Sequence, residues 1–230
     1  MTIKRISDIR LFRGNVPNVD GQPQPALIDD KTLTMYPQRV AMKLRELNFS
    51  LGDFDHLYLN LTPCLTEGTV QLSARTVYRE TAWYRYVDAG ITPDWQFSDM
   101  QQVSSLLEKA LLLFAAEDAR PLINTAFAEA QKGAHMLMQY KEKTANDYSA
   151  VIFLRLLDSG MYHPQLQVHW RNQLLLQADL SPCWELHQFG EISITKKAIT
   201  IKPRRNIFAS GLTSLVFHLD ELHHIHFTTS

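Results

Sequence analysis

Residues 98–138 read SDMQQVSSLLEKALLLFAAEDARPLINTAFAEAQKGAHMLM, and this stretch decides the fold. Its first half carries an apolar stripe at helical spacing, formed by Val103, Leu106, Leu107, Ala110, Leu111 and Phe114. Ser98 and Gln101 form a capping-box pattern in front of that stripe. A second apolar stripe follows Pro121 and continues to Met138. The pattern predicts two helices that are neighbours in space, because their connection is short.

From residue 149 onward the apolar pattern changes to that of strands. Residues 151–157 (VIFLRLL) are almost continuously apolar, which is typical of a central strand. Isoleucines on either side of Lys196-Lys197 predict a β-hairpin, and Leu215, Phe217 and Leu219 predict a last strand. Helices and strands therefore come in blocks. We predict an α+β protein with a central helical pair packed against largely antiparallel β-sheet and a strand-rich C-terminal half.

The N-terminal part mixes strands with one helix. We expect a strand at 9–13, a surface loop at 14–25, a helix that begins at Pro37, and a strand at 56–61. Two further strands are expected around 70–78 and 82–87. We predict a single α+β domain over 1–230. A subdivision into an αβ part (1–145) and a β-rich part (146–230) stays open.

The composition is that of an ordinary globular protein. The 230 residues are 45% hydrophobic and 20% charged, with a formal net charge of −1. Such a charge gives no field that attracts nucleic acid or an anionic membrane from a distance, so neither partner is expected. Cys64 and Cys183 are too few for a disulfide framework, and no signal peptide is visible. We therefore expect a cytoplasmic protein.

The C-terminal histidines are the strongest metal candidates. His218, His224 and His226 would share one face of a strand, and imidazoles are good zinc ligands. Their positions form a straight line, however, which suits a tetrahedral ion poorly. A polar strand face or a frayed end explains them better. We expect no metal and no cofactor, and a metal-dependent hydrolase remains an alternative.

Other catalytic signatures are missing. The chain has no GxSxG elbow and no glycine-rich phosphate loop, so we expect that it is not an enzyme. The basic stretch from Lys196 to Arg205 could serve an RNA-binding or scaffold protein, but Pro203 interrupts it and no RNP aromatics accompany it. This is the second alternative.

One segment fits an interaction surface. In Trp83-Tyr84-Arg85-Tyr86, a strand would place Tyr84 and Tyr86 on one face and the other two residues on the opposite face. Tyrosine, tryptophan and arginine dominate binding hot spots. Packing into a core on both faces is an equally good explanation.

Residues 36–60 (YPQRVAMKLRELNFSLGDFDHLYLN), followed by LTPCL and by AWYRYVDAGI at 82–91, resemble bacterial immunity proteins of contact-dependent inhibition and other polymorphic toxin systems. The resemblance covers about the first 90 residues and is greatest to those that guard against RNase toxins of the EndoU type. It implies a cytoplasmic protein that binds and neutralises a cognate toxin, here a nuclease domain. Acidic loop residues would then face the basic cleft of the nuclease. The partner-binding candidates are Asp29, Asp30, Asp53, Asp55, Tyr84 and Tyr86.

Overall fold

The computed structural model describes residues 4–95 and 100–222. The chain divides into two compact units, Met1–Met136 and Leu137–Ser230. The boundary thus lies after Met136 and not after residue 145. The reason is that strand β8 (Met138–Ala145) pairs along its length with β9 of the second unit.

The N-terminal unit contains a five-stranded sheet. Its strands, in spatial order, are β3 (Ala26–Leu27), β2 (Asp8–Arg13), β5 (His56–Thr62), β7 (Tyr84–Gly90) and β6 (Val70–Leu72). The three central strands run parallel, whereas β3 and β6 pair antiparallel at the edges. A parallel pair needs a crossover, and helix α1 supplies it between β2 and β5. Two short strands, β1 (Lys4–Arg5) and β4 (Ser50–Gly52), form a separate pair.

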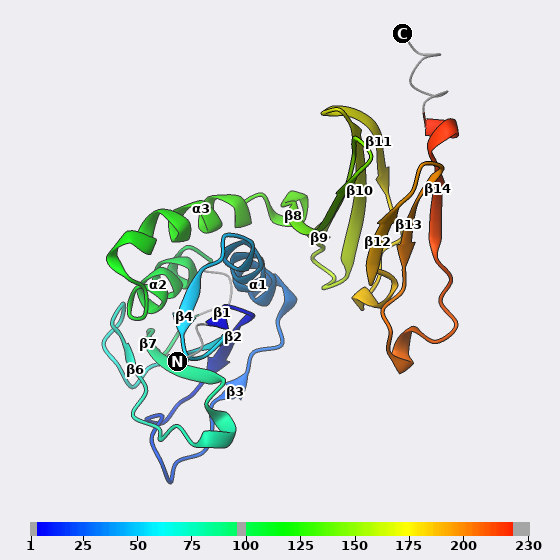
Figure 1. The fold of residues 1–230 in the computed structure, drawn as a ribbon. Coiled ribbons are helices and arrows are strands. Elements are labelled where there is room, and N and C mark those ends of the chain that lie inside the picture. Colours follow the sequence, from blue (N-terminus) through cyan, green and yellow to red (C-terminus); the bar gives the residue numbers. More distant parts are fainter. Residues whose placement is uncertain (1–3, 96–99, 223–230) are drawn as a thin grey trace. The chain divides into compact units, whose positions relative to one another are not determined.

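Three helices cover one face of this sheet (Figure 1): α1 (Lys31–Glu46), α2 (Met100–Leu112) and α3 (Arg120–Ala130). The predicted stripe on α2 is buried against the sheet, and Leu57, Leu59 and Leu61 of β5 meet it from the other side. The predicted helical pair is confirmed. Its second helix ends at Ala130, not at Met138, because Gly133 adopts a left-handed φ of 59° and Met138 already belongs to β8. Ser98 of the predicted capping box lies outside the described residues.

Helix α1 begins six residues before the predicted position at Pro37. Asp30 is its N-cap, and the Asp30 carboxylate accepts a hydrogen bond of 2.8 Å from the Thr32 amide. Pro37 lies inside the helix, where it removes one backbone donor. The prediction was wrong because proline also suits a first helical turn, and the β-branched residues after Asp30 hid the true start.

Replacing Asp30 with alanine should lower the free energy of unfolding by about 1 kcal/mol, the usual contribution of an N-cap side chain. The matched control is Asp29→Ala, which removes the same charge from the exposed neighbouring residue. Urea denaturation of both variants measures the difference. Equal losses would show that charge, and not the cap, is responsible.

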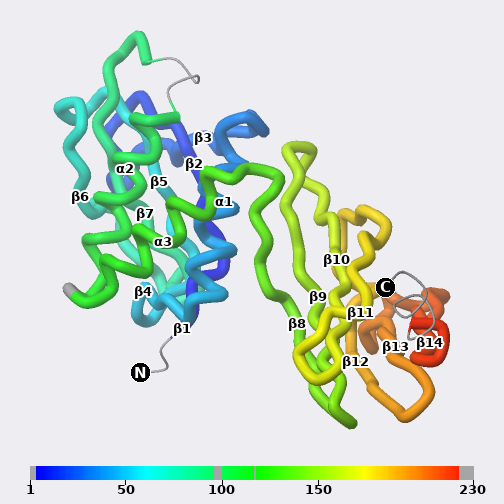
Figure 2. Tube along the Cα trace, turned by 90° about the horizontal axis from the view of Figure 1, so that it is seen from above, coloured from blue at the N-terminus to red at the C-terminus, as the bar shows by residue number. Residues whose placement is uncertain are grey.

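The C-terminal unit consists of two antiparallel sheets. One has the order β11 (Gln173–Asp179), β10 (Tyr162–Trp170), β9 (Tyr148–Leu156) and β8, and the other has β12 (Glu191–Ile194), β13 (Ala198–Lys202) and β14 (Leu215–His218). Figures 1 and 2 show the two sheets lying against each other, and their inward side chains, such as Ile152, Val168 and Ile199, are buried. The α+β class and the strand-rich C-terminal half are therefore confirmed. Among the described residues, no helix has the length and apolar character that crossing a membrane requires.

Candidate protein-binding surface

The side of the five-stranded sheet that faces away from the helices is rich in aromatic rings. Alternation along each strand turns leucine, isoleucine and valine toward the helices and the remaining side chains to this opposite side. We call the following set the aromatic face: Phe12, His56, Tyr58, Trp83, Tyr84 and Tyr86.

Tyr58 lies at the centre of the aromatic face. Its ring stacks on that of Tyr84, with centroids 4.5 Å apart and planes 19° apart. The rings of Phe12 and Tyr86 contact it at 4.8 and 5.3 Å, and Phe12 and Tyr86 also meet each other edge to face. These three strands bring together residues that lie far apart in the sequence. Tyr58 and Tyr86 are buried, so they form the floor of the surface.

Trp83 is the most accessible ring of the aromatic face, with 40% of the residue exposed. Its indole meets the rings of His56 and Tyr84 nearly at right angles, with centroids 4.7 and 4.8 Å apart. A large ring held by neighbours in this way loses little entropy when a partner covers it, which is the property of a binding anchor.

The floor phenols stay protonated at neutral pH. Burial raises the pKa of Tyr86 to about 12, and the nearby Tyr84 and Tyr58 rings add to the effect. Burial likewise raises the pKa of Tyr58, against the opposing influence of Arg10. Neutral phenols present O–H donors beside apolar rings, so the floor offers both hydrophobic and hydrogen-bonding contacts.

Carboxylates lie around the aromatic face. Asp8 pairs with Arg10 at 2.7 Å, and the Arg10 guanidinium lies 6.0 Å from the centre of the Tyr58 ring. Asp55 lies 2.7 Å from Nδ1 of His56. Asp53, whose side chain is 55% exposed, approaches Arg85 at 3.3 Å. The acidic rim is thus formed by Asp8, Asp53 and Asp55.

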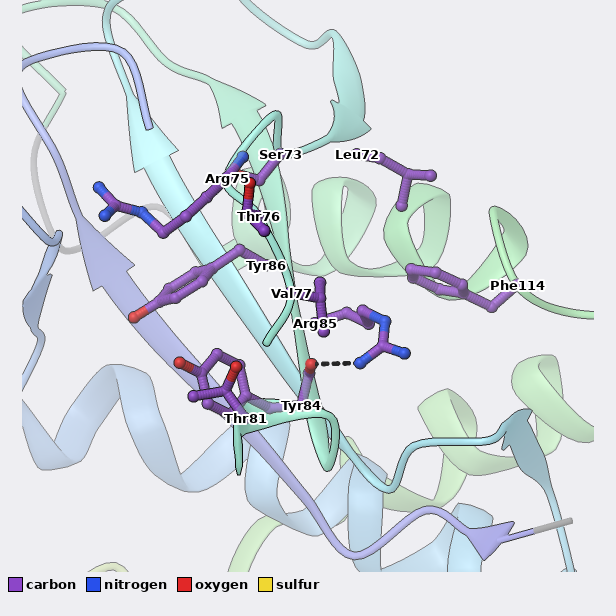
Figure 3. A pocket seen from close by; sticks show the side chains of 10 residues that line it. All are labelled: Leu72, Ser73, Arg75, Thr76, Val77, Thr81, Tyr84, Arg85, Tyr86 and Phe114. Atoms are coloured by element: carbon purple, nitrogen blue, oxygen red, sulfur yellow. Dashed lines mark hydrogen bonds between the residues drawn. The ribbon is translucent and has the colours of Figure 1, made fainter. Parts of the chain in front are cut away.

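A cavity of about 230 Å³ opens beside β7, between that strand and the segment that follows β6 (Figure 3). Tyr84 and Tyr86 line it from the strand, and Thr76 and Val77 line it from the segment. Arg85 donates a hydrogen bond of 2.8 Å to the Tyr84 carbonyl oxygen and thereby covers part of the strand edge. The cavity extends the aromatic face and gives a partner side chain a place to enter.

Buried polar side chains join the sheet to the loop at 14–25. Asp88 of β7 accepts hydrogen bonds from the side-chain amides of Asn60 (2.8 Å) and Asn18 (3.3 Å). Arg75 donates to Oδ1 of Asn18 and to two backbone carbonyls of the loop. Burial raises the pKa of Asp88, while the hydrogen bonds from Asn60 and Asn18 oppose that shift. This network fixes the loop at the end of the aromatic face.

The structure brings four of the six predicted partner-binding residues together. Asp53, Asp55, Tyr84 and Tyr86 all lie where β5 and β7 begin, although Tyr86 is buried. Asp30 is occupied as the cap of α1. Asp29 lies elsewhere, beside a cavity that β2 and the start of α1 line. Sequence reasoning missed Phe12, His56 and Tyr58, although the period-two alternation of residues 56–61 placed the latter two on one strand face.

The other candidate sites are less well supported by the described residues. His218 ends β14, whereas His224 and His226 lie outside them. Within the part of the chain that the structure describes, no group of three potential ligands is arranged to hold a metal ion. In the basic stretch, Glu191 approaches Lys202 at 3.5 Å and Arg205 at 3.9 Å.

Comparisons of the chain with protein-family models, with curated proteins and with solved structures found no match.

Proposed function

We propose that this chain is an immunity protein, which binds a cognate bacterial toxin domain in the cytoplasm and neutralises it without catalysis. The toxin is a ribonuclease in this proposal, and the aromatic face covers its active-site surface. The observation that carries the proposal is an aromatic face whose accessible ring, Trp83, lies beside an acidic rim. The resemblance of residues 36–60 and 82–91 to immunity proteins supplies the class of partner.

The chemistry of the surface suits a nuclease. A ribonuclease holds an anionic substrate, so its cleft is basic, and the acidic rim matches it in charge. Asp53 is exposed and its contact with Arg85 is long, so its carboxylate is available to an incoming lysine or arginine. The rings supply apolar area, which the charges alone could not.

The direct test is co-expression with the toxin domain encoded immediately upstream of this chain's gene. We expect the chain to restore growth, and the purified pair to form a one-to-one complex by calorimetry. A catalytically inactive toxin should bind equally well, because neutralisation acts through occupancy. Failure to restore growth, together with no measurable binding, would refute the proposal.

Neutralising Asp53 should slow the association with the toxin. We expect Asp53→Asn to lower the association rate several-fold at low salt and much less at high salt, because screening removes steering. The matched control is Asp147→Asn in the other unit, since Asp147 is also exposed and pairs with Arg171 at 3.2 Å. Stopped-flow mixing measures both rates. An equal effect of the two variants would mean that net charge and not the acidic rim steers binding.

A further inference from the structure

The C-terminal unit contains a charge run that the net charge of the chain conceals. No aspartate or glutamate occurs between Glu191 and Asp220. The same interval holds five basic residues: Lys196, Lys197, Lys202, Arg204 and Arg205. The local field is therefore positive, and it would attract an anionic partner.

Two bulky apolar side chains are exposed directly after the last of these basic residues. Ile207 is 78% exposed and Phe208 is 71% exposed, and both lie in the short turn η5 (Ile207–Ala209). Trp184 is 61% exposed and precedes the turn η4 (Leu186–Gln188), which contacts η5. Such a concentration of exposed apolar side chains marks an interaction site.

The turn that presents these side chains is held in place. Asn206 caps it, accepting a hydrogen bond of 3.0 Å from the Ala209 amide. The His187 ring stacks on that of Phe208, with centroids 5.4 Å apart. The Arg204 amide donates 2.7 Å to the His187 carbonyl oxygen. The apolar tip is thus preorganised, so covering it costs little ordering entropy.

A cavity of about 300 Å³ lies beside this tip, with Lys141, Lys202, Arg204 and Arg205 among its lining residues. Glu191 lines it as well and offsets part of the charge. Arg204 donates to the Tyr140 hydroxyl at 2.5 Å, which orients its guanidinium. Four cations against one carboxylate make this a place for an anionic group such as a phosphate.

We propose that the segment 202–212 docks the chain on the surface of an anionic lipid bilayer. The basic cavity would receive a lipid phosphate, while Ile207 and Phe208 enter the headgroup region. Stable attachment at an interface takes an apolar insertion together with a basic patch, and this segment combines the two. RNA would use the cations but leaves Ile207 unexplained. A second copy would bring like charges together at the same tip. The proposal is independent of toxin binding.

The test is sedimentation of the full chain with vesicles of phosphatidylcholine, with and without phosphatidylglycerol. We expect binding to the anionic vesicles only. Arg204→Gln with Arg205→Gln should weaken it roughly 30-fold, since each basic residue near such a surface contributes about fivefold. Ile207→Ser with Phe208→Ser should weaken it at least about tenfold. Thermal unfolding should stay unchanged, because the replaced side chains are exposed.

The matched control is Lys196→Gln with Lys197→Gln, which makes the same charge change at the other end of the hairpin. Strand β13 separates the two ends by about 15 Å, more than a Debye length of about 8 Å in physiological salt, so this variant should bind nearly as well as the parent. Three results would overturn the proposal. One is absence of binding to anionic vesicles. Another is equal loss in both basic variants with no effect at Ile207 and Phe208. The third is tighter binding to single-stranded RNA that the Ile207 and Phe208 replacements leave unchanged.

Discussion

Replacing Trp83 with alanine is expected to weaken the complex with the toxin by about 2–4 kcal/mol, or roughly 30- to 1,000-fold in Kd. Trp83 is the accessible ring of the aromatic face, and its neighbours His56 and Tyr84 already fix its orientation. The loss should appear mainly in the dissociation rate, as is usual for a buried anchor. Surface plasmon resonance with the immobilised toxin domain measures it.

The control is Trp184→Ala, which removes the same side chain from the C-terminal unit, where the indole is even more exposed. This variant should bind the toxin as tightly as the parent. Denaturant unfolding of both variants separates binding from stability. If Trp184→Ala weakened the complex as much as Trp83→Ala, the aromatic face would not be the toxin-binding surface.

The sequence predicts those elements whose side chains repeat over a long stretch. Helix α2 was found because its buried residues recur with the helical period, and β9 because it is apolar on both faces. Strand β8 was missed for the opposite reason. It reads MQYKEKTA, mostly polar, and a register shift interrupts its pairing with β9. Its first residues also continue the apolar stripe of the preceding helix, so local periodicity extended α3 too far.

The candidate surface shows a different limit of sequence reasoning. Alternation put Tyr84 and Tyr86 on one face, because that is a property of a single strand. The position of Phe12 and Tyr58 beside them depends on the parallel register of β2, β5 and β7, in which Phe12 pairs with Asn60 and Tyr58 with Tyr86. Pairing of strands so far apart in the chain is a tertiary property. Likewise, Asp30 could be a cap or a contact residue until the start of α1 was known.

The buried network at the end of the aromatic face should be the most sensitive point of the N-terminal unit. We expect Asp88→Leu to lower the free energy of unfolding by about 2–5 kcal/mol, because the side-chain amides of Asn60 and Asn18 would lose their acceptor inside the protein. Asp88→Asn keeps an acceptor oxygen of the same shape and should cost much less. Urea denaturation of the two variants gives the comparison.

The same pair of proteins also tests the charge of Asp88. Burial raises the pKa of its carboxyl in the folded state, so the folded protein holds this proton more tightly than the unfolded chain. Stability should then fall as pH rises from about 4, the value of a free carboxyl, through the raised pKa of the folded state. Arg75, which lies close enough to lower that pKa, limits the loss. Asp88→Asn has no proton to release, so the fall should be smaller in this variant. Identical pH profiles of parent and variant would mean that Asp88 is ionised at no cost to the fold.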